Sequence, residues 1–211
     1  MKKTILTSFI FVTYTKLVLA WKPNGFPFIP ACNDVTKVRE LIIQAQGNGK
    51  RILDIGCGNG FSTSSYKGSL GIDINEKNIF EAKQMFPYKN FSLLSMNDEK
   101  HKEEFEVVTS MFYLSTVPQY IRTKLLNYAC ETAKERVVIL DVSPEYITDN
   151  KLLTERKIYN PDFMQTFRDD LSHFNENVLV DGVLNVWIYN IPKTKDPTRK
   201  QIKPSFDTDF K

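Results

Sequence analysis

Two acidic residues and a run of glycines occur together in this chain at the spacing of a nucleoside-binding site. Residues 52–60 read Ile-Leu-Asp-Ile-Gly-Cys-Gly-Asn-Gly, an apolar strand that ends in a carboxylate and breaks into alternating glycines. Glycine lets the backbone turn sharply and approach a ligand where a Cβ would clash. Asp73 follows in a second apolar strand, about 20 residues further on, where a βαβ unit brings an acid to a ribose diol. The two motifs predict a site for a nucleoside with a charged tail.

The glycine pattern distinguishes two kinds of ligand. A dinucleotide fingerprint is Gly-x-Gly-x-x-Gly, and its pyrophosphate rests on a helix N-terminus. Here the pattern is Asp-x-Gly-x-Gly-x-Gly, from Asp54 to Gly60. A carboxylate just ahead of the turn repels a pyrophosphate and favours a ligand with a positively charged amino group or sulfonium.

At these residues the sequence resembles the class I S-adenosylmethionine-dependent methyltransferases. Residues 52–60 are similar to the first motif of that family, and residues 70–75 (Leu-Gly-Ile-Asp-Ile-Asn) are similar to its acidic second-strand motif. Later segments follow in the family's order, so the resemblance covers residues 33–191 and is strongest to the methyltransferase type 11 or ubiquinone–menaquinone group. It implies an α/β fold with three Rossmann-like layers: a doubly wound, mostly parallel sheet of seven strands that ends in an antiparallel hairpin.

The resemblance also implies the cofactor, S-adenosylmethionine, and the residues that bind it. In that family a polar residue just after the third strand hydrogen-bonds the adenine amino group, and Asn97 or Asp98 could do so here. Asp98 as the cap of a short helix is an equal alternative. The residues implied for the cofactor are Asp54, Gly56, Cys57, Gly58, Gly60, Asp73, Ile74, Asn97, Asp98 and Met111.

The sequence indicates the residues that bind the acceptor less clearly than those that bind the cofactor. The carboxyl ends of the central strands flank the ligand in a doubly wound sheet, so aromatic or acidic residues near those ends are candidates. Phe112 and Tyr113 could contact a sulfonium through their ring faces, although core packing explains them equally well. No catalytic base is assigned, because one is needed only if the acceptor must lose a proton. The acceptor candidates are Tyr66, Phe112, Tyr113, Asp141 and Tyr146.

Composition limits the kinds of protein that this chain can be. The chain has 211 residues and a net charge of +3, which suits one globular domain and does not indicate nucleic-acid binding. Its three cysteines are far apart and it has two histidines, so the sequence predicts no metal site.

The chain divides into four parts. Residues 1–22 are apolar with Lys2, Lys3 and Lys16, which fits a membrane anchor or interfacial helix, a cleaved targeting signal, or a helix packed on the domain. Residues 23–32 are a proline-rich extended connector, and residues 33–191 form the domain. The charged, proline-punctuated residues 192–211 are predicted to lack fixed structure. We expect the domain in the cytoplasm or at the cytoplasmic face of a membrane.

Hydrophobic periodicity predicts the elements of the domain. The segment 61–67 is short for a crossover helix, residues 145–174 contain two helices broken at Asn160-Pro161, and Asp181-Gly182 is a hairpin turn. The remaining predicted helices are 33–46, 75–86 and 118–135, and the predicted strands are 51–55, 70–74, 91–96, 105–110, 136–142, 176–180 and 183–191.

The first functional hypothesis is methyl transfer to a small-molecule or lipid-like acceptor, and the apolar N-terminus agrees with a membrane-held one. Within the same family, a protein-lysine methyltransferase is an alternative. A non-catalytic S-adenosylmethionine-binding module of the same fold and a nucleotide-dependent oxidoreductase are the other two. The chain has no Asn-Pro-Pro-Tyr-like sequence after the fourth strand, which argues against amino-group methylation of nucleobases or glutamine.

Overall fold

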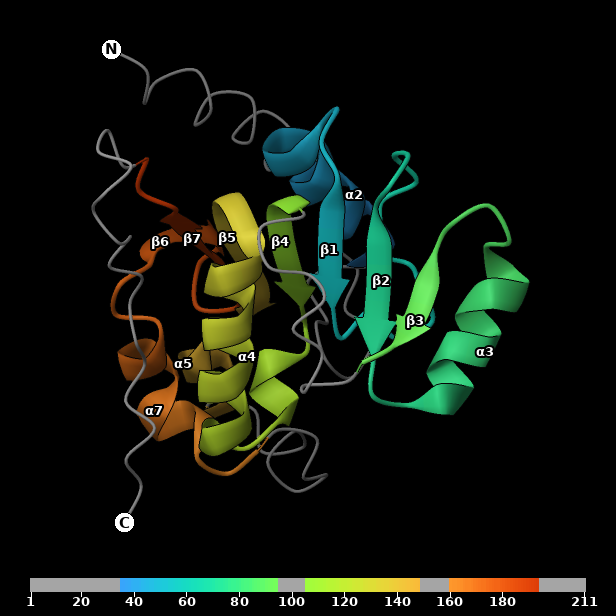
Figure 1. Cartoon of the computed structure of the whole chain (residues 1–211). Helices are drawn as coiled ribbons and strands as arrows, with labels where there is room; N and C mark the ends of the chain where they lie inside the picture. Colours follow the sequence, from blue (N-terminus) through green and yellow to red (C-terminus); the bar gives the residue numbers. More distant parts are fainter. Residues whose placement is uncertain (1–34, 95–104, 149–159, 194–211) are drawn as a thin grey trace.

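The middle of the molecule is a single seven-stranded sheet. The computed structural model describes residues 35–94, 105–148 and 160–193. Within them the strand order is β3-β2-β1-β4-β5-β7-β6 (Figure 1). The first five strands are parallel, and β7 runs antiparallel between β5 and β6. The predicted fold class, an α/β doubly wound sheet with a C-terminal antiparallel hairpin, is confirmed.

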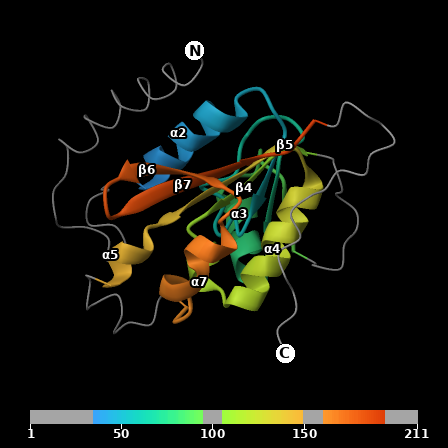
Figure 2. The ribbon, with the colours of Figure 1, turned by 90° about the vertical axis from the view of Figure 1, so that its left-hand side faces the viewer.

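Helices cover both faces of the sheet, with α2 on one side and α4 and α7 on the other (Figure 2). The strands are β1 (Ile52–Ile55), β2 (Leu70–Asp73), β3 (Phe91–Leu93), β4 (Phe105–Met111), β5 (Ala133–Val142), β6 (Asn175–Val180) and β7 (Leu184–Asn190). The helices are α2 (Val35–Gly47), α3 (Glu76–Met85), α4 (Gln119–Thr132), α5 (Pro144–Thr148) and α7 (Phe163–Asp170), with a short 3₁₀ turn η2 (Leu114–Thr116).

The central strands determine where a ligand can bind. Every residue of β1 is buried, and the register pairs Asp54 with Thr109 and Ile55 with Ser110 of β4. Parallel strands end at the same side of a sheet, so the segments that follow β1, β2, β4 and β5 meet there. We call this side the carboxyl edge.

The start of β5 was predicted wrongly. The sequence pattern continues the helix to Glu135 and begins the strand at residue 136, whereas α4 ends at Thr132 and β5 begins at Ala133. Ala133 pairs with Phe105 at the start of β4, and the carbonyl oxygen of Glu135 accepts a hydrogen bond from the Ile191 N–H at 2.8 Å. These contacts with distant strands outweigh the local helical pattern.

No helix connects β1 to β2. Turns join Gly56 to Ser69, as the short predicted segment indicates. Asn75 caps α3, and its side chain accepts a hydrogen bond from the Lys77 N–H at 2.9 Å. The predictions for residues 1–22 and 23–32 lie outside the described residues, as does the predicted tail, residues 192–211, beyond Lys193. Among the described helices, none is both long and apolar enough to cross a membrane.

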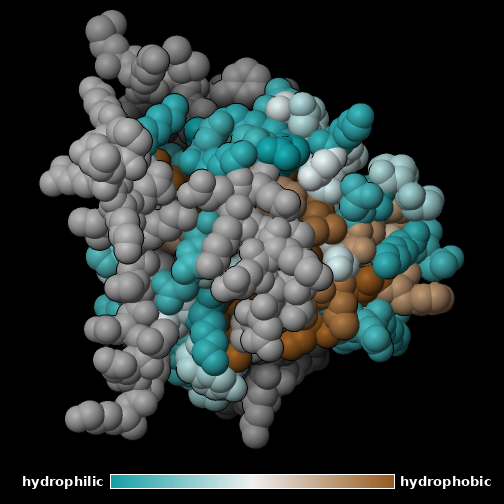
Figure 3. Space-filling view, viewed as in Figure 1, coloured by the Kyte–Doolittle hydropathy of each residue, from teal (hydrophilic) through white to brown (hydrophobic). Residues whose placement is uncertain are grey.

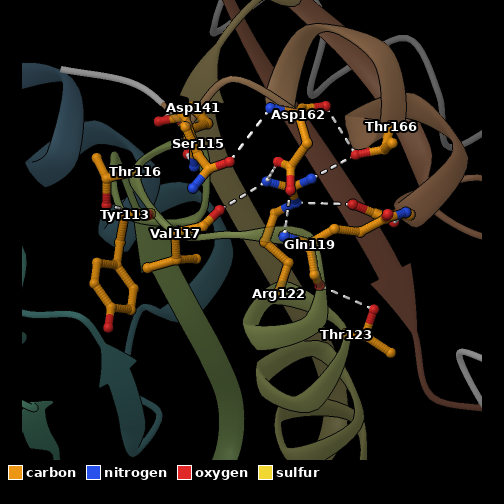
Figure 4. Close-up of polar contacts among 12 residues, drawn as sticks. Tyr113, Ser115, Thr116, Val117, Gln119, Arg122, Thr123, Asp141, Asp162 and Thr166 are labelled. Atoms are coloured by element: carbon orange, nitrogen blue, oxygen red, sulfur yellow. Dashed lines mark hydrogen bonds and ion pairs between the residues drawn. The ribbon is translucent and has the colours of Figure 1, made fainter. Parts of the chain in front are cut away.

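A buried arginine joins α4 to α7 below the carboxyl edge (Figure 4). Arg122 is fully buried, and its Nε donates to Asp170 Oδ2 at 2.8 Å. Its Nη1 donates to Asp162 Oδ1 at 2.9 Å and to the Val117 carbonyl at 2.8 Å. Asp162 also accepts a hydrogen bond from the N–H of Gln119, the first residue of α4, at 2.8 Å. The network thereby fixes α7 against the segment that follows β4.

Replacing Asp170 with alanine should destabilise the protein strongly. Arg122 would remain buried with one of its two carboxylate partners removed, which typically costs about 3–5 kcal/mol. Urea denaturation measures the free energy of unfolding. The matched control is Asp169→Ala, because Asp169 is the exposed neighbour, and we expect a change within about 0.5 kcal/mol. A similar small change for Asp170→Ala would contradict the role given to this network.

Candidate functional site

The glycine loop after β1 is anchored to β2 and open at its tip. The N–H groups of Gly56 and Cys57 both donate to the Ile72 carbonyl, at 2.8 and 3.0 Å. Gly56 and Gly58 have φ angles of 72° and 52°, in the left-handed region that favours glycine. A Cβ at Gly58 would meet nothing within 4 Å. The backbone at Gly58 can therefore be approached closely by a ligand.

The carboxylate of Asp73 lies against this loop. Its Oδ2 accepts a hydrogen bond from the Gly58 N–H at 2.9 Å. Its Oδ1 accepts from the Asn75 N–H at 2.8 Å and from Asn78 Nδ2 at 3.3 Å. An ionised carboxylate offers about four acceptor positions, so Asp73 can still accept a hydrogen bond from a ligand hydroxyl.

An apolar surface adjoins Asp73. Ile74, the next residue, is 64% exposed, and Leu93 at the end of β3 is 46% exposed. Figure 3 shows this apolar surface over β2 and β3, beside α3. A flat apolar group that lay next to the Asp73 carboxylate would contact these side chains.

Asp54 is fully buried and holds the loop onto the sheet. Ser62 Oγ and Thr63 Oγ1 donate to its Oδ2 at 2.7 and 2.9 Å, and Thr109 Oγ1 donates to its Oδ1 at 3.1 Å. Burial raises the pKa of Asp54, and the three hydroxyls act in the opposite direction. Its hydrogen bonds in this structure all go to protein hydroxyls. Asp54 therefore fixes the position of the loop over the end of β1.

The segment after β4 carries two aromatic rings with different neighbours. Phe112 has a φ of 59°, alone among the non-glycine residues that the structure describes, and such a conformation costs about 1–3 kcal/mol. Its N–H donates to the Leu140 carbonyl at 2.8 Å. The ring of Tyr113 lies on Gly56, because a Cβ there would be 2.2 Å from two ring carbons.

Tyr113 belongs to the same part of the site as the glycine loop. Burial raises the pKa of Tyr113, and the charge of Asp73 raises it further. Its ring therefore lies on the glycine loop, where the charge of Asp73 acts on it. In Figure 4 its ring points away from Asp141 and Ser115. The structure thus places Tyr113 beside the predicted cofactor residues, although the sequence offered it for the acceptor.

Asp141 is buried within the protein framework. Ser115 donates to it twice, from Oγ at 2.7 Å and from its N–H at 3.0 Å, and the Val142 N–H donates at 2.9 Å. Burial raises the pKa of Asp141 to about 6, and these donors limit the rise. Asp141 therefore holds η2 at the carboxyl edge. Ser115, its partner, was not identified from the sequence, because no local motif distinguishes it from other serines.

Arg39 was also not identified from the sequence as a residue of the site. Its guanidinium carbon lies 5.2 Å from the centre of the Phe112 ring. Burial lowers the pKa of Arg39, and the charge of Asp54 raises it. A charged residue on an amphipathic helix is usually solvated. The available signal was its position next to the apolar stripe that contains Val38 and Ile42.

The remaining predicted residues are spread more widely. Tyr66 is exposed in the turn that precedes β2, where its carbonyl accepts a hydrogen bond from the Ser69 N–H. Because this turn comes before the strand, Tyr66 lies at the edge of the sheet opposite the carboxyl edge. Met111 is buried in the main core, and Tyr146 packs against that core from α5. Asn97 and Asp98 lie outside the described residues. Phe112 contacts Leu140 and Arg39. Of the predicted residues, those in or near the glycine loop are Asp54, Gly56, Cys57, Gly58, Gly60, Asp73, Ile74 and Tyr113.

Cys57 and Gly60 complete the loop as packing residues. Cys57 is 4% exposed, and burial raises the pKa of its thiol, so it behaves as a small apolar side chain. A Cβ at Gly60 would lie 2.6 Å from the Phe91 ring. In the described parts of the chain, no group of three or more His, Cys, Asp or Glu residues could hold a metal ion.

A protein of known function resembles part of this chain in sequence. It is the ubiquinone biosynthesis O-methyltransferase of Aromatoleum aromaticum, which is 37% identical over 81 residues. The match covers 33% of this chain and 34% of that protein, so the chain aligns with about a third of its relative's length. No family model matches the chain.

Solved structures resemble the chain over most of its length. The magnesium protoporphyrin IX methyltransferase of Synechocystis, with bound S-adenosylhomocysteine, has a TM-score of 0.57 at 16% identity and covers 90% of this chain and 99% of its own. A TehB-like S-adenosylmethionine-dependent methyltransferase of Corynebacterium glutamicum has a TM-score of 0.52 at 20% identity, with coverages of 84% and 97%. The chain therefore has the fold of the class I S-adenosylmethionine-dependent methyltransferases, the family that its glycine motif resembles.

Proposed function

We propose that this chain is an enzyme that transfers a methyl group from S-adenosylmethionine to a small-molecule or lipid-like acceptor. The observation that carries the proposal is the hydrogen bond between the Gly58 N–H and Asp73, at a loop whose backbone is open to a ligand. The sequence relative and the two proteins of similar structure are all named as methyltransferases, which supports the proposal. No contact among the described residues favours the protein-lysine or the non-catalytic alternative. The proposed catalytic domain spans residues 33–191.

We assign residues of the chain to three parts of the cofactor: the ribose, the adenine and the methionine end. Asp73 would accept hydrogen bonds from the ribose hydroxyls, and Ile74 would pack on the adenine ring. Asn97 or Asp98 would bind the adenine amino group. The methionine end would lie near Gly56 and Tyr113, where the charge of Asp54 favours a cation.

The protein has a limited task in the chemical step. The sulfonium of S-adenosylmethionine is already activated, so the enzyme must hold the acceptor in line with the methyl group and exclude water. The ring of Tyr113, which lies on Gly56, would stabilise the positive charge through its face. Asp141 is not assigned as a base, since its oxygens accept three hydrogen bonds from Ser115 and Val142.

We further propose that residues 1–22 hold the domain at an anionic membrane surface, through their apolar side chains and Lys2, Lys3 and Lys16. The full chain should sediment with vesicles that contain phosphatidylserine and remain in solution with phosphatidylcholine vesicles. A chain that lacks residues 1–22 should remain in solution with both. Equal sedimentation of the two chains would contradict this role.

Replacing Asp73 with alanine should weaken binding of S-adenosylhomocysteine. The ribose hydroxyls would lose a charged partner, which is worth roughly 1–3 kcal/mol of binding free energy. Isothermal titration calorimetry measures the change. Asp181→Ala is the control, because Asp181 is an exposed acid of the hairpin turn, and its affinity should stay at the wild-type value. An unchanged affinity in Asp73→Ala would refute the assignment to the ribose.

Two glycines give a matched test of the loop. Gly49 and Gly58 have φ angles of 71° and 52°, and a Cβ at either meets nothing within 4 Å. Alanine should therefore cost similar folding free energy at both, about 1–2 kcal/mol. Only Gly58→Ala should weaken S-adenosylhomocysteine binding, by at least about tenfold, because its Cβ would obstruct the approach of the ligand. Equal affinities in the two variants would show that the ligand does not approach Gly58.

A further inference from the structure

The glycine loop has no crossover helix after it, and α3 with the turn that follows α3 contacts the loop instead. Asn59 Nδ2 donates a hydrogen bond to Glu81 Oε2 on α3 at 2.8 Å. The Gly60 carbonyl accepts a hydrogen bond from Lys89 Nζ, in the turn between α3 and β3, at 3.1 Å. Two consecutive loop residues are therefore bound by side chains that lie 22 and 29 residues further along the chain.

Aromatic rings extend this contact to the next loop residue. The ring of Phe61 meets that of Phe86, the residue that follows α3, edge to face with the centroids 5.3 Å apart. The Nζ of Lys89 lies over the same Phe86 ring, 4.2 Å from its centroid. Contact with a ring face favours the charged form of a lysine. The ammonium of Lys89 is thus fixed between the Phe86 ring and the Gly60 carbonyl.

The Gly60 carbonyl depends on Lys89 because no helix forms at this point. In a helix the carbonyl would accept a hydrogen bond from the N–H four residues later. Here the Thr63 N–H donates to it at 3.3 Å, longer than an ordinary hydrogen bond of this kind. The ammonium of Lys89 is a charged donor, and such donors form hydrogen bonds about twice as strong as neutral ones. Burial lowers the pKa of Lys89, whereas the charges of Asp54 and Glu40 raise it.

We propose that Lys89 is a positioning residue for the cofactor: it fixes the glycine loop at Gly60 and so strengthens cofactor binding without touching the cofactor. The inference rests on the proposed function, because it takes this loop as the place where the cofactor binds. The loop backbone that is open to a ligand is at Gly58, whose N–H binds Asp73. Lys89 binds the loop two residues further on. A loop without this contact would have to be ordered when the ligand binds, and that ordering would reduce the affinity.

Lys89→Met tests this role, because methionine keeps an apolar side chain on Phe86 and removes the ammonium. In calorimetric titration of the full chain, we expect Lys89→Met to bind S-adenosylhomocysteine about tenfold more weakly than wild type, the effect of one hydrogen bond to a charged group. Lys89→Arg should restore most of the affinity, since a guanidinium can donate to the Gly60 carbonyl and stack on the ring. Lys83→Met is the control, because Lys83 is an exposed lysine of α3, and its affinity should equal that of wild type.

Amide hydrogen exchange of the chain without ligand measures the order of the loop directly. Residues 56–63 should exchange faster in Lys89→Met than in wild type, and at about the wild-type rate in Lys89→Arg. The buried strands β4 and β5 should exchange at the wild-type rate in both variants. A general loss of stability would accelerate exchange in these strands as well, so the comparison separates a local effect on the loop from partial unfolding.

Two results would overturn the inference. One is an affinity of Lys89→Met for S-adenosylhomocysteine equal to that of wild type. The other is unchanged exchange of residues 56–63 in Lys89→Met with weakened binding, which would assign Lys89 to direct contact with the ligand. Failure of wild-type protein to bind S-adenosylhomocysteine would instead contradict the proposed function, and the exchange rates without ligand would show separately whether Lys89 fixes the loop.

Discussion

The burial of Asp54 is the constraint on which the rest of the site depends. A carboxylate that is removed from water needs hydrogen-bond donors, and here they come from two hydroxyls of the loop after β1 and one of β4. The loop must therefore fold back over the end of its own strand. In most βαβ units a crossover helix provides this cover. Here the end of β1 is covered by a loop that hydroxyl side chains hold onto the buried Asp54. The backbone at Gly58 stays accessible.

The position of the loop then determines that of the other ligand-facing groups. Gly56 and Cys57 bind the end of β2 through the Ile72 carbonyl, and Gly58 binds the Asp73 side chain. Tyr113 packs on Gly56, where no Cβ intervenes. A shift of the loop would therefore disturb Asp73 and Tyr113 together. Glycines and acids from separate strands are thereby held in one arrangement.

Sequence reasoning succeeded where the determining interactions are local. The glycine loop and the C-terminal hairpin follow from short motifs, the run from Asp54 to Gly60 and the pair Asp181-Gly182. It failed where partners lie far apart in the chain: Ala133 joins β5 through contacts with Phe105, and Arg122 is paired with Asp162 and Asp170. Arg39 resembles a solvated helix residue until Phe112 is placed beneath it. The glycine loop was predictable because backbone and adjacent acids build it, whereas the surroundings of Arg39 and Arg122 come from tertiary contacts.

Three strands deliver a buried carboxylate to the carboxyl edge: Asp54 from β1, Asp73 from β2 and Asp141 from β5. Each accepts hydrogen bonds from neighbouring segments, so each fixes part of the carboxyl edge. Burial raises the pKa of Asp54 and of Asp141, the latter to about 6, and so opposes their ionisation, whereas the hydroxyl and N–H donors favour it. Under the proposed function, an ionised carboxylate at this edge would attract the sulfonium of the donor. Methyl transfer removes that positive charge from sulfur, so this attraction would be absent in the product.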